Sequence, residues 1–318
     1  MLVLVTGGAG RLGITVCRML QKKGFRVRVF DLPSPRNRRS VRELGSKVEV
    51  HWGDITNADS VGRAVEGVDA VIHMAGILPP VTEANPALAE KVNVRGTQTL
   101  VDAVRATGKR MPFVFTSSVA VFGPTPAATE PVSVERNAPN PRDIYGVTKL
   151  KAENLIRESG IGYIILRLSA SMYTIFEARD LKRVYGIPLE NRVELCHPEE
   201  VSLAIVNAVV NFEAAKGNTL IISGGPKGRM LYKDMIRGIL SVLRLPLPPA
   251  RKFTQQPFYL DYYDTSKSQL LLQYQHKTFG DYLGDFRTTL ARRFTPAFLP
   301  FMCYFVGPLF GKIVMRLI

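Results

Sequence analysis

The sequence is poor in cysteine and in acidic residues. Its three cysteines, Cys17, Cys196 and Cys303, are scattered and form no CxxC pair. This spacing argues against a disulfide framework or a zinc site and indicates a reducing compartment. Against 42 lysines and arginines stand only 27 aspartates and glutamates, a formal net charge of +15. Such a charge attracts anions, and because no nucleic-acid-binding motif is present, we expect nucleotide phosphates or anionic lipid rather than nucleic acid.

The N-terminus also lacks the basic region and long apolar run of a secretory signal. Its apolar run, residues 2–5, is too short for a signal peptide and instead predicts a first strand. We therefore expect a cytoplasmic protein. A length of 318 residues allows one large domain or two unequal ones.

Short apolar runs alternate with amphipathic stretches through the first two-thirds of the chain. The runs are rich in valine and isoleucine without strict alternation, as in strands that are buried on both faces. This order predicts an α/β fold of the Rossmann type, a doubly wound parallel sheet with a smaller C-terminal substrate region. The predicted strands are Leu2–Thr6, Arg26–Phe30, Val48–His51, Ala70–His73, Phe113–Thr116 and Tyr163–Arg167. The predicted helices are Arg11–Lys23, Ala58–Val65, Ala87–Ala106 and Ile144–Ser159.

A glycine-rich loop, TGGAGRLG at residues 6–13, follows the first strand and opens the first helix. Gly7 permits a tight turn, Gly10 lets the backbone approach a pyrophosphate, and Gly13 lets the helix pack close to the sheet. Free N–H groups at the helix start would face the anion. Strand, loop and helix in this order predict a dinucleotide site. The residues expected to contact the cofactor here are Gly7, Gly10, Arg11, Leu12 and Gly13.

The second predicted strand leads into Asp31, 18 residues after Gly13. A carboxylate there would accept hydrogen bonds from the adenosine ribose and repel a 2′-phosphate, which favours NAD over NADP. Arginines at 11, 36, 38 and 39 could reach a phosphate, so NADP stays open. Asp54, followed by Ile55, is placed to meet the adenine amino group. Its alternative role is the N-cap of the following helix.

Tyr145 and Lys149 form a YxxxK pattern at the start of a predicted helix. The i, i+4 spacing puts both on one face, roughly 5–6 Å apart at Cβ. A phenol with a pKa near 10 needs about 4 kcal/mol of differential stabilisation to reach a pKa near 7. A nearby ammonium and a positive nicotinamide ring both favour the phenolate. We therefore predict Tyr145 as the catalytic acid/base, with Lys149 also holding the nicotinamide ribose.

Two serines end the fifth predicted strand, at the carboxyl edge of the sheet where ligands bind in such folds. A serine hydroxyl there could hydrogen-bond the substrate oxygen. We choose Ser118 for this role, with Ser117 as the second candidate. A structural cap of the strand end or turn is the alternative for either residue.

In chain order, these segments resemble the extended short-chain dehydrogenases/reductases, also called the NAD-dependent epimerase/dehydratase family. The resemblance covers about residues 1–285. The matching segments are residues 6–13, Asp31, Gly53-Asp54, His73–Gly76, Val92–Thr97, Ser117–Gly123, Tyr145–Lys149, Leu166-Arg167, His197–Val201 and Asp264–Lys267. The resemblance implies a catalytic triad of Ser118, Tyr145 and Lys149. It also adds Ala75 to the residues along the cofactor and makes Asn93 mainly structural.

Departures from the family pattern bear on the reaction and the substrate. Dehydratases of the family carry Asp-Glu beside the catalytic hydroxyl, whereas Ser118 is followed by Val119-Ala120, so we do not expect dehydration. Nucleotide-sugar members usually carry Arg-Tyr-Phe-Asn, but residues 167–170 read Arg-Leu-Ser-Ala. We expect a dehydrogenase, reductase or epimerase that acts on a lipid- or sterol-like alcohol or a nucleotide sugar. The alternative is a non-catalytic nucleotide-binding regulatory or assembly protein, although such relatives often lack the tyrosine or lysine.

The C-terminal tail has a different composition. Residues 294–311 contain no charge and three prolines, and basic residues flank them on both sides. This pattern suits a segment lying in the interface of an anionic membrane, at its inner face, better than a spanning helix. The alternative is a tail packed on the domain or on the partner of an expected homodimer. We divide the chain into a NAD(P)-binding domain (1–170, with later segments returning to it), a mainly substrate-binding region (171–285) and this tail (286–318).

Overall fold

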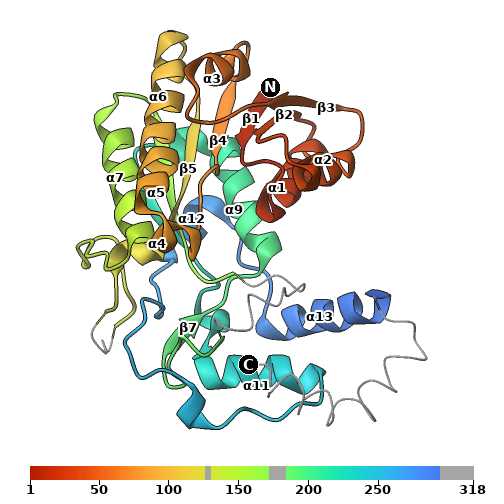
Figure 1. The fold of residues 1–318 in the computed structure, drawn as a ribbon, viewed down its shortest axis with the longest axis vertical. Coiled ribbons are helices and arrows are strands. Elements are labelled where there is room, and N and C mark those ends of the chain that lie inside the picture. The colour runs from red at the N-terminus through yellow and green to blue at the C-terminus, as the bar shows by residue number, and fades with distance from the viewer. Residues whose placement is uncertain (126–129, 172–183, 294–318) are drawn as a thin grey trace.

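The computed structural model describes residues 1–125, 130–171 and 184–293 (Figure 1). Its main feature is a seven-stranded parallel sheet with the strand order β3-β2-β1-β4-β5-β6-β8. The strands are β1 (Leu2–Thr6), β2 (Arg26–Asp31), β3 (Val48–Trp52), β4 (Ala70–His73), β5 (Phe113–Ser118), β6 (Tyr163–Leu168) and β8 (Thr219–Ile222). All six predicted strands are confirmed. The seventh, β8, was not predicted and returns to the sheet from the C-terminal half.

Helices cover both faces of the sheet and bury two separate cores. The helices on the two faces of the sheet are α1 (Arg11–Lys22), α2 (Pro35–Arg42), α3 (Ala58–Val65), α6 (Gly96–Ala106), α7 (Ile144–Glu158), α9 (Pro198–Val210), α10 (Phe212–Ala215) and α12 (Ser266–Leu272). Side chains of β1 alternate between the cores: Val3 and Val5 pack with α1 and α9, whereas Leu2 and Leu4 pack with α3, α6 and α7. Each such buried side chain contributes roughly 1.5–3 kcal/mol. Burial on both faces explains why the central strands β1, β4, β5 and β6 show no polar alternation, whereas β2 and β3, towards one edge of the sheet, alternate polar and apolar residues.

The predicted helix Ala87–Ala106 is interrupted. A short α5 (Pro86–Ala89) continues as a π-helical segment, η1 (Glu90–Arg95), before α6 begins. The wide turn carries Asn93, whose side chain donates to Ile77 O (3.1 Å) and Thr148 Oγ1 (3.2 Å) and accepts from Ile77 N (2.8 Å). These contacts anchor the loop after β4 to α7, as the structural role implied for Asn93 requires. Together with α4 (Val81–Ala84), these short helices lie beside α7 (Figure 1).

The C-terminal half adds a smaller layer below the sheet in Figure 1. It contains the antiparallel pair β7 (Arg192–Glu194) and β9 (Arg229–Leu231), and the helices α11 (Tyr232–Val242) and α13 (Phe279–Arg293). Short 3-10 segments complete the described part: η2 (Val119–Phe122), η3 (Pro226–Gly228) and η4 (Ala250–Lys252). A third core joins α11 and α13, and Phe286 is buried in it. Residues 286–293 of the predicted tail therefore lie within α13, whereas residues 294–318 are outside the described residues.

Candidate functional site

The glycine-rich loop lies at the carboxyl end of β1, between β1 and α1. Gly7 has φ +71°, and a Cβ there would lie 2.8 Å from Ala75 N in the loop after β4. A Cβ at Gly13 would lie 2.6 Å from Gly8 Cα, so only glycine lets α1 start this close to the loop. Gly10, at the N-cap of α1, has no side chain that could satisfy the N–H groups of the first turn. Arg11 and Leu12 open this turn, so the loop has the shape and the donors of an anion cradle.

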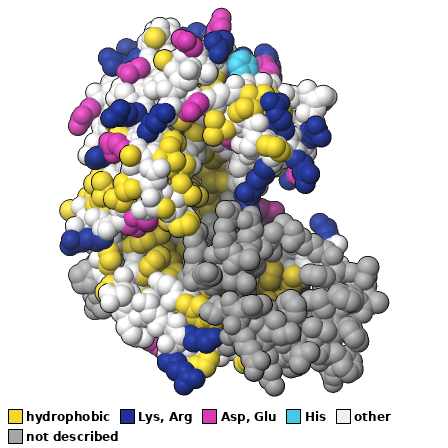
Figure 2. All heavy atoms as spheres, viewed as in Figure 1, with side chains coloured by type: hydrophobic (Ala, Val, Ile, Leu, Met, Phe, Trp, Pro, Cys, Tyr) yellow, Lys and Arg dark blue, Asp and Glu magenta, His cyan; other side chains and the backbone are white. Residues whose placement is uncertain are grey.

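Asp31 lies beside this loop at the end of β2. Its carboxylate accepts hydrogen bonds from Ala9 N (3.0 Å), Leu32 N (2.8 Å) and Asn37 Nδ2 (3.0 Å). Burial raises its pKa, although the backbone hydrogen bonds partly offset this. On the face in Figure 2, basic side chains predominate over α2, whose sequence contains four arginines. Of these, Arg38 lies over the ring of Trp52, 5.1 Å from its centroid.

Asp54 does not cap the next helix. Its Oδ1 accepts from Thr56 N and Thr56 Oγ1, both at 2.9 Å, within the turn before α3. The N-cap is Asn57, whose side chain accepts from Ser60 N at 2.8 Å. The N-cap alternative for Asp54 is therefore wrong, because the N-cap of α3 lies three residues later. The side chain of Ile55 is buried in the core and faces Gly96, so a ligand would meet Ile55 through its backbone.

A buried chain of hydrogen bonds supports the loop that contains Ala75. Thr6 Oγ1 accepts from Ala75 N (3.2 Å) and donates to His73 Nδ1 (2.7 Å). His73 Nε2 then donates to Thr97 Oγ1 (2.9 Å), which donates to Asn93 O (2.7 Å). Burial lowers the pKa of His73 to about 3, with a smaller contribution from Lys149, so its ring is neutral. The sequence patterns did not predict this role of Thr6, His73 and Thr97. For Thr6 and His73, a polar residue at the end of a buried strand was the available signal.

The structure brings Tyr145, Lys149 and Ser118 together where α7 begins beside the end of β5. The hydroxyl of Ser118 lies beside the phenol of Tyr145, close enough to lower its pKa. Lys149 Nζ donates to Thr116 O at 2.8 Å and lies 5.9 Å from the centroid of the Tyr145 ring. Ser118 Oγ also accepts from Ala120 N at 3.1 Å, so this serine both caps a turn and reaches Tyr145. Ser117, the second candidate, instead donates to Glu153 on the other side of the strand.

Acidic residues fix the start of α7. Asp143 is the N-cap and accepts from Gly146 N at 2.6 Å, and Glu83 accepts from the N–H groups of Ile144 and Tyr145, both at 3.2 Å. Carboxylates near a helix N-terminus are also stabilised by the helix dipole. The backbone of Tyr145 is therefore held from two sides.

Burial dominates the electrostatics of this group. It raises the pKa of Tyr145, and Tyr259 and Asp143 raise it further, while the hydrogen bond with Ser118 lowers it. Burial also lowers the pKa of Lys149 to about 8, against the opposing effect of Glu153. Lys149 is not among the groups that shift the pKa of Tyr145 in the protein without cofactor. Its effect on the phenol, together with that of the nicotinamide ring, stays a prediction. The residues around it hold Tyr145 as a neutral phenol.

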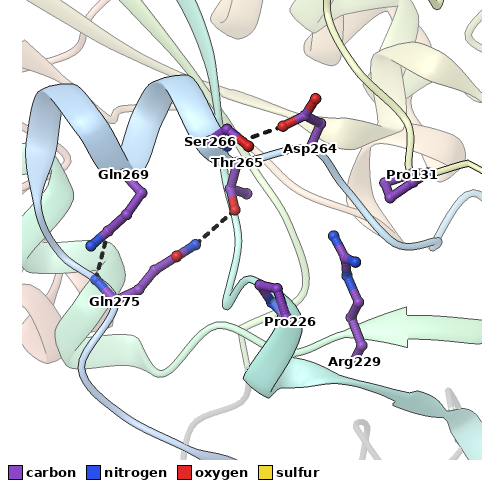
Figure 3. Close-up of a pocket in the computed structure, with 8 residues that line it drawn as sticks. All are labelled: Pro131, Pro226, Arg229, Asp264, Thr265, Ser266, Gln269 and Gln275. Carbon is purple, nitrogen blue, oxygen red and sulfur yellow. Dashed lines mark hydrogen bonds between the residues drawn. The ribbon is translucent and has the colours of Figure 1, made fainter.

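A separate cavity of about 480 Å³ lies between α12, η3 and the loop that contains Pro131 (Figure 3). Polar residues that line it form hydrogen bonds with one another: Gln275 Nε2 donates to Thr265 Oγ1 (2.9 Å), and Asp264 accepts from Ser266 N (3.1 Å). None of the predicted catalytic or cofactor residues lines this cavity. Within the described ranges, no group of three or more metal-ligating side chains could hold a metal ion.

Comparison with known proteins identifies the family. The model of the NAD dependent epimerase/dehydratase family matches residues 3–173. This chain belongs to that family. It is 36% identical to 3 beta-hydroxysteroid dehydrogenase type 7 of Rattus norvegicus over 162 residues, which are 49% of this chain and 48% of the relative. It is also 36% identical to a UDP-glucose 4-epimerase of Schizosaccharomyces pombe over 168 residues, 49% of this chain and 46% of the relative. The chain thus spans about half the length of these curated relatives.

Solved structures share the fold over most of the chain. UDP-glucuronic acid 4-epimerase from Bacillus cereus, in complex with UDP-glucuronic acid and NAD, has a TM-score of 0.76 and 22% identity over 91% of this chain and 100% of that chain. A short-chain dehydrogenase/reductase superfamily protein from Agrobacterium tumefaciens, with bound NAD, has a TM-score of 0.77 and 22% identity over 92% of this chain and 98% of that one. At this identity, the likeness establishes the fold.

Substitution of Gly13 tests the anion cradle. We expect Gly13→Ala to weaken NAD binding at least tenfold, because the new methyl group would push α1 away from the loop. Gly62→Ala, in α3, is the matched control: nothing lies within 4 Å of a Cβ there. That substitution should stabilise the helix by up to about 1 kcal/mol. Isothermal titration with NAD and thermal unfolding measure the two effects, and equal NAD affinity in both variants would contradict the assignment.

Proposed function

We propose that this chain is an NAD-dependent oxidoreductase or epimerase that transfers a hydride at a secondary alcohol or ketone. The observation that carries the proposal is the convergence of Tyr145, Ser118 and Lys149 next to the glycine-rich loop at the carboxyl edge of the sheet. Membership of the NAD dependent epimerase/dehydratase family and the NAD-bound structural neighbours support NAD as the cofactor. Asp31 beside the loop favours NAD over NADP.

The cofactor would lie across the carboxyl edge, where the glycine cradle leaves space that a Cβ would fill. When bound, NAD accepts or supplies the hydride. Residues proposed to hold it are Gly7, Gly10, Arg11, Leu12, Gly13, Asp31, Asp54, Ile55, Ala75 and Lys149. Lys149 already contacts Thr116 O, and its ammonium would turn to the ribose hydroxyls.

Tyr145 would exchange the proton of the reacting oxygen, and Ser118 would orient that oxygen by a hydrogen bond. In ketone reduction, the neutral phenol donates its proton to the oxygen as hydride reaches carbon. In alcohol oxidation, the phenolate must first form, which requires positive charge close to the ring. Lys149 and the nicotinamide ring would supply this charge together. The high phenol pKa of the protein without cofactor therefore suits the acid role and makes the base role depend on cofactor binding.

Dehydration does not fit the site. The two residues after Ser118, Val119 and Ala120, are apolar and almost fully buried, so they provide no acid and base for elimination. The two sequence relatives named above suggest two substrate classes: a sterol-like alcohol and a nucleotide sugar. An enzyme that releases the ketone is a dehydrogenase or reductase. One that lets the ketone turn over before hydride returns is an epimerase.

Replacement of Tyr145 by phenylalanine separates an enzyme from a nucleotide-binding regulator. Tyr145→Phe removes the exchangeable proton, so we expect kcat to fall by about 10²–10⁴-fold. NAD affinity should change less than about threefold, because the phenol is not the main binding group. Activity is followed at the nicotinamide absorbance with sterols and nucleotide sugars as substrates. Cellular function that survives this change, with NAD binding intact, would support the non-catalytic alternative.

For the domains, we keep the division into a nucleotide-binding domain (1–170), a mainly substrate-binding region (171–285) and a basic apolar tail (286–318). The return of β8 to the sheet supports the idea that later segments complete the first domain. We propose that the tail attaches the protein peripherally to the inner, anionic face of a membrane and that the protein forms a homodimer. In the part of the chain that the structure describes, no helix is long and apolar enough to span a membrane.

Removal of the tail tests membrane attachment. The cut belongs after Arg293, because Phe286 is buried in the core of α11 and α13. We expect deletion of residues 294–318 to move the protein from the membrane fraction to the supernatant, with the melting temperature unchanged within about 2 °C. Lys312→Glu combined with Arg316→Glu is the matched variant, which alters charge without removing apolar area. Unchanged fractionation of the truncated protein would overturn the proposal.

A further inference from the structure

Three residues of α7 contact the end of β5 at a constant spacing. Tyr145 meets Ser118, Lys149 Nζ donates to Thr116 O (2.8 Å), and Glu153 Oε1 accepts from Ser117 Oγ (2.5 Å). Their spacing of four residues places all three on the same face of the helix. The first two contacts belong to the proposed catalytic group, whereas the third has no assigned role. Glu153 lies about two helical turns beyond Tyr145.

Glu153 is the most constrained of the three. Its side chain is fully buried, and besides Ser117 it binds Arg167 of β6 through both oxygens, with Nε at 2.9 Å and Nη2 at 2.8 Å. Arg157, one turn further along α7, adds a contact at 2.7 Å. These charge-assisted bonds keep the pKa of Glu153 below its usual range despite burial. A single carboxylate therefore joins α7 to both β5 and β6 at the edge where the proposed chemistry takes place.

Glu153 is also a source of negative charge for Lys149. The two residues are one helical turn apart, and burial lowers the pKa of Lys149 to about 8 while Glu153 raises it. Other titratable groups near this lysine contribute little negative charge: the Tyr145 phenol and the His73 ring are both neutral. Arg167 and Arg157 are cations that form ion pairs with Glu153. Asp143, at the start of α7, interacts with Tyr145.

We propose that Glu153 is a positioning residue for the Tyr145 reaction, which fixes α7 against β5 through Ser117 and supplies the buried negative charge that Lys149 requires. The positioning part rests on the function proposed above, whereas the charge part concerns Lys149 alone. A carboxylate with a merely structural role, as an ion pair with Arg167, would change stability when it is removed but would leave the ionisation of Lys149 unaffected.

Direct titration of Lys149 tests the charge. In protein labelled with ¹³C at the lysine ε-carbon, the pH dependence of the Lys149 resonance, assigned with Lys149→Arg, gives its pKa without cofactor or substrate. We expect Glu153→Gln to lower this pKa, with at least a tenfold rise in the acid dissociation constant, because a buried ammonium loses its compensating charge. Glu90→Gln is the matched control, since Glu90 binds Lys151 of the same helix at 3.0 Å on the surface. It should leave Lys149 unchanged.

Loss of a partner for buried Arg167 could prevent folding of Glu153→Gln. The double variant Glu153→Gln, Arg167→Met leaves Arg167 out of the buried site. In this protein too, the pKa of Lys149 should be lower than in the wild type. Conversely, Glu153→Asp keeps the charge and should hold the dissociation constant within about threefold of the wild type. An unchanged Lys149 titration in whichever of the two Gln-containing proteins folds would overturn the charge part.

Kinetics test the positioning part. Ser117→Ala removes the hydrogen bond of the strand to Glu153 but keeps every charge, so we expect kcat to fall about tenfold with KM and the Lys149 titration unchanged. In Glu153→Gln, Lys149 should lose its proton at a lower pH, and the loss of this positive charge raises the pKa of the Tyr145 phenol. The limb of the kcat–pH profile that reports formation of the phenolate should therefore move to higher pH. Wild-type kcat in Ser117→Ala would overturn this part. A wild-type protein that binds NAD without turnover would instead refute the proposed function, and the lysine titration would still be decisive.

Discussion

The contact between the first turns of α7 and the end of β5 is the interaction on which the rest of the site depends. A parallel sheet brings the carboxyl ends of its strands to one edge, so the loops after β1, β4 and β5 lie side by side. Helix α7 carries a phenol and an ammonium to that edge. The hydrogen bonds of Asp143 and Glu83 to its first turn, and the contact of Lys149 with Thr116, hold the helix where Tyr145 meets Ser118.

Much of this arrangement could be predicted from the sequence, because it follows from local patterns. The six predicted strands are short runs rich in valine and isoleucine, and the glycine-rich loop has steric requirements that only glycine meets at Gly7 and Gly13. Other features depend on the fold. β8 follows α9 and α10 in the C-terminal half, beyond the regular alternation of strands and helices, and α2 is a basic segment with few apolar residues, so neither was predicted. The π-helical turn at η1 likewise depends on the contacts of Asn93 with segments distant in sequence.

The electrostatics were the least predictable part, since they depend on burial. The spacing of Tyr145 and Lys149 suggested a lowered phenol pKa, but in the protein without cofactor desolvation at the end of β5 is the largest effect on this pKa and raises it. Desolvation also lowers the pKa of His73, whose ring is therefore neutral, and the pKa of Lys149. A sequence shows which groups can ionise, whereas the depth of each group in the fold decides which of them do. The site therefore needs charge from elsewhere before Tyr145 can act as a base.

The part of the chain beyond the family match also contributes to the surroundings of Tyr145. The family match ends at residue 173, and a hydroxysteroid dehydrogenase and a sugar-nucleotide epimerase each align with about half of this chain. The segment before α12, which lies beyond residue 173, comes close to Tyr145. Tyr263 pairs with Val132 in the loop after β5, Thr125 Oγ1 donates to Asp261 at 2.5 Å, and Tyr259 contributes to the raised pKa of Tyr145. Because this segment contacts the loop after β5 and also raises the pKa of Tyr145, a substitution in it would alter the ionisation of the phenol as well as the packing of the loop.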